Sequence, residues 1–148
     1  MELSIIFLPL IAAIISGFFG KYIGDRNSEI VTSALVSISA LLSIFVLYQV
    51  IVNQYEENIV IATWINSGSL DVNWSMLIDP LSAVMLVVVT SVSSLVHIYS
   101  IGYMSHDPHK PRFMAYLSLF TFAMLMLVTS DNFVQLFFGW EGVGLCSY

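Results

Sequence analysis

One acidic residue, Glu141, stands within an apolar stretch that runs from Asp131 to Tyr148. If this stretch is a helix that enters a bilayer near Asp131, Glu141 lies roughly 15 Å along its axis, at about 1.5 Å per residue. That depth is close to the middle of a hydrocarbon core about 30 Å thick. A carboxyl group there costs on the order of 3 kcal/mol, and such residues usually serve to move ions or protons. We therefore expect Glu141 to carry protons.

Three glycines and a serine surround this carboxyl group: Gly139, Gly142, Gly144 and Ser147. Glycine costs about 1 kcal/mol relative to alanine within an exposed helix, so three of them indicate close approach by another helix or by water. Two alternatives stay open. In the first, Glu141 only joins two helices through a hydrogen bond. In the second, the end of the chain is unfolded and Glu141 lies in water.

A second set of polar side chains, which we call the polar seam, recurs at steps of three and four residues: Thr90, Ser93, Ser94, His97 and Ser100. This spacing places the set on one side of a helix whose other residues are mostly apolar, so we expect it to face helices or water rather than lipid. Imidazole has an ordinary pKa near neutrality, which makes His97 a candidate proton relay. The alternative is a structural histidine, hydrogen-bonded to a backbone carbonyl or a serine.

Depth separates the two ionisable candidates. Counted from Asp79 and Pro80, His97 lies roughly 25 Å along its helix, against about 15 Å for Glu141. An offset of about 10 Å excludes a direct hydrogen bond, which requires a separation of about 3 Å. Water and hydroxyl groups would have to connect them.

Composition bounds the class of protein. Of the 148 residues, 58% are hydrophobic and only 9% are charged, and the mean hydropathy is +0.90, which indicates a membrane protein. The four Lys and Arg residues are too few for nucleic-acid binding. One cysteine, Cys146, cannot form an internal disulfide or hold an iron–sulfur cluster. We expect neither a bound cofactor nor a metal, and His106, Asp107 and His109 read as a solvated turn.

The charge-free runs predict an all-α membrane protein with about five transmembrane helices, the last of them truncated. The approximate spans are 3–20, 30–52, 80–104, 113–129 and 132–148.

The loop between the second and third spans, residues 53–79, predicts a β-hairpin. A β-branched run at 59–65 is followed by a turn at 66–69 and by alternating apolar residues at 72–78. We expect this hairpin on the outer surface, with Trp64 and Trp74 at the membrane interface. The alternative is an irregular loop with an aromatic anchor.

The positions of the few cations predict how the chain is oriented in the membrane. Lys21 and Arg26 fall in the first expected loop, and Lys110 and Arg112 fall in the third, whereas the second has none. The positive-inside rule then places loops one and three in the cytoplasm and the N-terminus outside.

Two segments, residues 94–104 and 131–148, resemble a known family: the antiporter-like membrane subunit called chain L or chain 5 of NADH:quinone oxidoreductase, respiratory complex I. The resemblance covers nearly the whole chain. It implies that Glu141 belongs to a proton channel and pairs with a lysine on a later helix. Changes in the separation of that pair would shift their pKa values and drive protons across the bilayer. The histidine at position 97 is not uniform across the wider family.

The resemblance also implies partners and location. The partners would be the other membrane-arm subunits and the remainder of the same subunit. NADH, FMN, iron–sulfur clusters and quinone would belong to the wider complex. The membrane would be the bacterial inner membrane or the mitochondrial inner membrane.

Family members run to several hundred residues, far more than this chain. The lysines here, Lys21 and Lys110, lie in expected loops, so neither is the lysine that would pair with Glu141. We therefore expect an N-terminal fragment, a truncated gene product or one piece of a split subunit, without a complete proton path. The alternatives are a subunit of a multisubunit sodium/proton antiporter and a non-functional remnant. That antiporter family usually has Thr-Ser after the Trp-Glu pair, where this chain has Gly-Val-Gly at 142–144.

Overall fold

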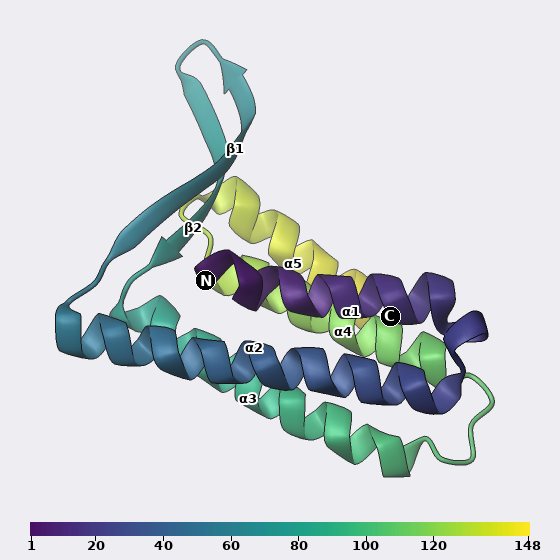
Figure 1. The fold of residues 1–148 in the computed structure, drawn as a ribbon. Helices are drawn as coiled ribbons and strands as arrows, with labels where there is room; N and C mark the ends of the chain where they lie inside the picture. Colours follow the sequence, from purple (N-terminus) through teal and green to yellow (C-terminus); the bar gives the residue numbers. More distant parts are fainter.

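A computed structural model describes all 148 residues as five helices and one β-hairpin. Figure 1 shows the long helices lying side by side, with the hairpin leaving one end of them and the shorter C-terminal helix lying along the bundle. The elements are α1 (Glu2–Ile23), α2 (Asp25–Asn53), β1 (Glu57–Ser67), β2 (Leu70–Ile78), α3 (Pro80–Tyr103), α4 (Lys110–Val128) and α5 (Phe133–Ser147). The predicted fold class, helical with a small hairpin, is confirmed.

Helices α1 to α4 are long and apolar enough to cross a membrane. Their 22, 29, 24 and 19 residues correspond to the roughly 20 residues needed to span the hydrocarbon core. Helix α5 has 15 residues and is not among these candidates. Pro9 lies within α1, and the helix continues through it.

The first expected loop is wrong in extent. Lys21 lies in the last turn of α1 and Arg26 in the first turn of α2, so that only Gly24 separates the two helices. Gly24 has φ 89°, a left-handed conformation that glycine adopts without steric cost, and this permits the abrupt reversal. Polar residues at the ends of a span remain helical because water solvates their side chains there. Glu29, which lies one residue before the expected span 30–52, is also part of α2.

Two helix starts follow from local side-chain chemistry. Asp79 caps α3 by accepting a hydrogen bond from the Ser82 backbone N–H at 2.6 Å, with Pro80 next to it at the first helical position. Asn132 caps α5 in the same way, accepting from the Gln135 N–H at 2.8 Å.

Helix α1 contacts α2 and α4, α2 also contacts α3 and α4, α3 contacts α4, and α5 contacts α4. We call the end where α2 leads into the hairpin the hairpin end, and the end where Gly24 joins α1 to α2 the turn end (Figure 1). The largest apolar core lies at the hairpin end, where side chains of α1, α2, α3 and α4 meet Met76 and Ile78 of β2.

The hairpin pairs β1 with β2 antiparallel from Glu57↔Ile78 to Ser67↔Leu70, with Gly68 at φ 63° in the turn. Its tip extends beyond the helices (Figure 1). Trp64 and Trp74 stack across the strands with ring centroids 4.9 Å apart, and Phe138 of α5 lies 4.8 Å from Trp74. These aromatic contacts attach the hairpin to α5.

Candidate proton-transfer site

His97 is fully buried between α3 and α4. Its Nδ1 lies 2.7 Å from the Ser93 carbonyl oxygen and its Nε2 lies 3.0 Å from the Ser118 hydroxyl of α4. Because a carbonyl only accepts, Nδ1 carries a hydrogen, and a neutral ring then accepts from Ser118 at Nε2. Hydroxyl groups able to pass a proton onward lie on both sides of the ring: Ser118 at Nε2, and Ser93, whose Oγ is 3.3 Å from Nδ1. Both expected partners of a structural histidine, a carbonyl and a serine, are also present.

The polar seam faces other helices, but in two directions. Thr90 and Ser94 face α2, where Thr90 shares a hydrogen bond with Ser43 at 2.7 Å and Ser94 shares one with Ser37 at 2.8 Å. Ser93 faces α4 and shares a hydrogen bond with Thr121. The polar seam therefore makes two hydroxyl contacts with α2 and one with α4.

Ser93 and Thr121 also line a groove of about 340 Å³ between α3 and α4. The other eight residues of this groove are apolar: Met85, Val88, Val89, Val92, Val96, Leu117, Phe120 and Met124. The groove brings the α4 side of the seam close to the molecular surface.

Glu141 lies on the face of α5 that points away from α4 and is exposed. The glycines beside it have the close contacts that we predicted. A Cβ on Gly139 would lie 2.8 Å from backbone atoms of Leu127, and one on Gly142 would lie 3.2 Å from the Ala123 Cβ. Gly144 meets nothing within 4 Å. Glycine thus lets α5 lie directly on α4, and this contact turns Glu141 outward.

His97 and Glu141 are on different sides of α4. Along α4, His97 lies opposite Ser118, and Gly142, next to Glu141, lies opposite Ala123. Five residues of helix correspond to roughly 7.5 Å along the axis. His97 has its hydrogen bonds to Ser93 and Ser118, and the structure does not bring the two ionisable groups together.

The carboxyl group that this chain itself buries is Glu29, which sequence reasoning left just before an expected span. Only 5% of Glu29 is exposed, and its Oε1 has no hydrogen-bond partner. A sequence signal existed. Steps of three and four residues backward from Ser43 along the small-residue face of α2 reach Val36, Thr32 and then Glu29, all of them buried.

Gln135 was also missed. It is fully buried, its Oε1 accepts from the Ser75 N–H at 3.0 Å, and its Nε2 donates to the Ser75 carbonyl at 2.7 Å. The amide forms the two backbone hydrogen bonds that a further strand would form with β2 at Ser75. Its role is to hold α5 against the hairpin, and no sequence pattern indicates a contact across 60 residues.

Asp131, before α5, accepts hydrogen bonds from Asn58 of β1 at 3.0 Å and from Asn132 at 2.7 Å. Partial burial alone raises the pKa of the Asp131 carboxyl, but hydrogen bonding by Ser75, Asn58 and Asn132 outweighs it and lowers that pKa below its ordinary value. Asp131 therefore remains charged at neutral pH and joins β1 to the start of α5.

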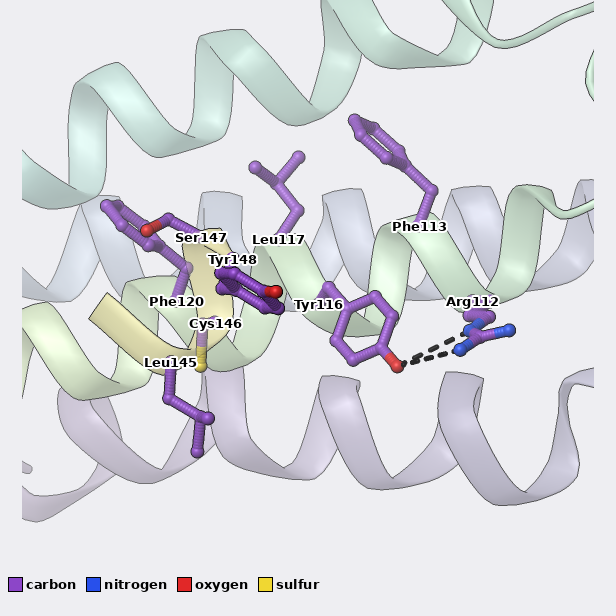
Figure 2. Close-up of a pocket in the computed structure, with 9 residues that line it drawn as sticks. All are labelled: Arg112, Phe113, Tyr116, Leu117, Phe120, Leu145, Cys146, Ser147 and Tyr148. Carbon is purple, nitrogen blue, oxygen red and sulfur yellow. Dashed lines mark hydrogen bonds between the residues drawn. The ribbon is translucent and has the colours of Figure 1, made fainter. Parts of the chain in front are cut away.

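A hollow of about 690 Å³ lies between α4 and the end of α5. Figure 2 shows its lining, in which the Arg112 guanidinium donates to the Tyr116 hydroxyl at 3.3 Å and most other side chains are apolar. Neither Glu141 nor His97 lines it. At the turn between α3 and α4, the Asp107 carboxylate accepts from the His109 N–H at 2.7 Å. No group of three or more His, Cys, Asp or Glu residues is placed to hold a metal ion.

Comparisons with known proteins agree with the helical membrane fold. A family model described as NADH-ubiquinone oxidoreductase (complex I), chain 5 N-terminus, matches residues 64–114. Over all 148 residues, the chain is 56% identical to NADH-ubiquinone oxidoreductase chain 5 of Arabidopsis thaliana and 49% identical to that of Metridium senile. Over 146 residues, it is 54% identical to the chain 5 of Phytophthora infestans. The chain spans 22% of the Arabidopsis and Phytophthora relatives and 25% of the Metridium relative.

The four long apolar helices and the polar side chains between them define a multi-pass helical membrane protein. The matches confirm the resemblance carried by residues 94–104 and 131–148. Over its whole length, the chain matches the N-terminal part of NADH-ubiquinone oxidoreductase chain 5. The alternative of a sodium/proton antiporter subunit gains no support from the relatives named above.

Proposed function

We propose that this chain contributes to proton translocation by NADH:quinone oxidoreductase, as the N-terminal part of a chain 5 subunit in which Glu141 is the proton carrier. The observation that carries the proposal is the contact between α4 and α5. Gly139 and Gly142 pack α5 against α4, and the Glu141 carboxyl is held on the opposite face. A carboxyl group on the free face of an apolar helix is ready to meet a basic partner from outside residues 1–148.

His97 and the polar seam are proposed to assist. The hydroxyls of Ser93 and Thr121 are hydrogen-bonded beside His97, whose ring reaches Ser118. Hydroxyl groups both donate and accept, so this cluster is able to relay a proton through α3 and α4. Thr90 and Ser94 extend the seam toward α2.

The orientation proposed for the subunit uses the cations. Lys21 and Arg112 line one hollow at the turn end, and Arg26 and Lys110 lie in the first turns of α2 and α4 at the same end. With positive residues facing the cytoplasm or the equivalent matrix side, the N-terminus and the hairpin face outward. The proposed location is the inner membrane of a bacterium or a mitochondrion, among the other membrane-arm subunits.

The test is Glu141→Gln in the full-length subunit of the assembled enzyme, reconstituted in sealed vesicles. Quinone-dependent NADH oxidation and proton uptake are measured in the same preparation. We expect electron transfer to persist and proton movement through this subunit to slow by at least about tenfold, since a positioned proton-transfer group is lost. The matched control is Glu56→Gln, an exposed acid before the hairpin. Normal proton uptake by Glu141→Gln would refute the proposal.

A further inference from the structure

A group of buried polar atoms at the turn end has no role in the site described above. The Glu29 Oε1, the Ser28 Oγ and the Ser33 Oγ are all inaccessible and have no hydrogen-bond partner. Ser28, Glu29 and Ser33 are at least 93% buried, and Ser33 follows Glu29 by one helical turn. Buried polar atoms normally have partners, and a buried carboxylate without one is strongly disfavoured. The group therefore calls for water bridging these atoms.

An open hollow of about 590 Å³ lies next to this group, between the end of α1 and the start of α4. Its lining includes Gly20, Lys21 and Asp25. A Cβ placed on Gly20 would lie 3.5 Å from the Ser28 Oγ and 2.6 Å from the Pro111 Cβ. Only a glycine thus separates the hollow from Ser28, whose neighbour along the chain is Glu29. The hollow therefore comes close to one member of the buried group, Ser28, and Glu29 is the next residue of α2.

On the inner side, hydroxyl groups lead away from Glu29 toward α3. Ser37, one turn beyond Ser33, donates to the Ser33 carbonyl at 2.7 Å and shares a hydrogen bond with Ser94 at 2.8 Å. Ser94 belongs to the polar seam and follows Ser93, the hydrogen-bond partner of His97. The free Ser33 hydroxyl lies between the carboxyl and this pair along the face of α2. We call Glu29, Ser33, Ser37 and Ser94 the α2 file.

We propose that Glu29 is a second proton-carrying carboxyl of this chain, which takes up protons at the turn end and passes them along the α2 file to the polar seam. The inference rests on the proposed function, because it supplies an entry for the protons that the subunit moves. Glu29 differs from Glu141 in being enclosed by the chain itself.

The transfer balances at each step. A hydronium ion from the hollow gives its proton to the Glu29 carboxylate and leaves water. The carboxyl then gives a proton, through bridging water, to the oxygen of Ser33. A second bridging water carries the proton from the Ser33 hydroxyl to the Ser37 hydroxyl, because Ser37 is hydrogen-bonded to the Ser33 carbonyl, which cannot relay a proton. Each water or hydroxyl accepts one proton and releases its own to the next oxygen, and Ser94 releases the last one to water at the polar seam, so that no group of the file keeps a net charge. The ionised Glu29 is thereby restored.

The experiment compares Glu29→Gln, Glu141→Gln and the parent in the full-length subunit of the assembled enzyme in sealed vesicles. Glutamine keeps the shape of the side chain but cannot carry a proton. We expect Glu29→Gln to retain NADH oxidation and to lose as many protons pumped per NADH as Glu141→Gln does. If Glu141→Gln is impaired and Glu29→Gln pumps normally, the inference is overturned and the proposed function stands. If Glu141→Gln pumps normally and Glu29→Gln is impaired, the assignment of Glu141 fails instead.

Two serine variants supply a matched pair within α2. Ser37→Ala interrupts the α2 file, whereas Ser39→Ala removes a buried hydroxyl that donates to the Ile5 carbonyl at 2.6 Å and lies outside the file. We expect lower proton uptake per NADH in Ser37→Ala and parent uptake in Ser39→Ala. Equal uptake in both overturns the inference, and this pair decides the question if Glu29→Gln does not assemble.

Infrared difference spectroscopy adds a readout that a purely structural role would not change. We expect a carboxyl band during turnover that shifts in D₂O and is absent from Glu29→Gln. Identical carboxyl bands in the parent and Glu29→Gln would overturn the inference.

Discussion

The two ends of the helix bundle differ in how they satisfy their buried side chains. At the hairpin end, ten buried apolar residues form one cluster, and the polar Gln135 has two hydrogen bonds to Ser75. The unpaired buried atoms there are neutral oxygens of Asn73 and Ser75, whereas those of the turn end include a carboxyl oxygen. At the turn end, Ser28, Glu29 and Ser33 are buried with polar atoms left unpaired. The first arrangement stabilises a fixed structure. The second sacrifices stability, which proteins tolerate where a group has to exchange protons or water.

The largest loss of stability is expected from a substitution in the apolar core of the hairpin end. Met76→Ala removes a fully buried side chain that contacts the cluster shared by four helices. We expect a loss of about 2–5 kcal/mol, from lost contacts and a residual cavity. Thermal unfolding in detergent micelles measures it, with Val60→Ala, an exposed position of β1, as the control. Equal melting of the two variants would show that this core is not where stability resides.

The contact between α5 and α4 is tested next. Gly139→Ala places a Cβ 2.8 Å from the Leu127 backbone, which cannot move aside as a flexible side chain does. We expect a loss of about 1–3 kcal/mol as the helices separate. Gly144→Ala is the control, since a Cβ there meets nothing within 4 Å. Melting of Gly139→Ala at the parent temperature would contradict the packing described for α5.

A smaller effect is expected from Asp131. Folding lowers the pKa of Asp131, so its contribution to stability is present above the ordinary pKa and is lost as the pH falls through the lowered value. Because most of Asp131 is exposed to solvent, we expect less than about 1 kcal/mol.

The measurement is the difference in melting between the parent and Asp131→Asn at pH values from about 7 down to about 2, a range that covers the titration of aspartate. The difference should shrink toward acid pH. Asp71→Asn, an exposed acid in the same hairpin, serves as the control. A difference that grows on acidification would reverse the assigned sign.

The smallest stability effect is expected at the turn end itself. Glu29→Gln removes a buried carboxyl whose Oε1 has no partner, so unfolding free energy should change by less than about 0.5 kcal/mol or rise. Thermal unfolding of Glu29→Gln, with Glu56→Gln as the control, measures this change in unfolding free energy. A loss as large as that of Met76→Ala would mean that Glu29 is a structural residue, and the contrast between the two ends would disappear.

Much of the local structure was predictable because its causes lie within a few residues. Asp79 and Pro80 indicate a helix start, and the alternation at 72–78 indicates a strand. Gly139 and Gly142 indicated close helix approach, which the contacts with Leu127 and Ala123 confirm. The proton-transfer roles of Glu141 and His97 stay predictions.

Other features depended on contacts that no local pattern records. The first loop shrank to Gly24 because helices at a membrane surface tolerate Lys21 and Arg26 in their last and first turns. Gln135 meets Ser75 across 60 residues of chain. The polar seam has a single periodicity in sequence, and only the positions of α2 and α4 divide it between two partners.

The sequence by itself determined the number of helices, the hairpin and the family resemblance, because apolar length, capping chemistry and residue identity are properties of a linear chain. Tertiary structure decided which carboxyl group the chain encloses. The sequence placed Glu141 on a helix and left Glu29 just before one, and burial depends on which neighbouring helix covers each residue. The packing of α5 through Gly139 turns Glu141 outward, and the packing of α2 within the bundle encloses Glu29.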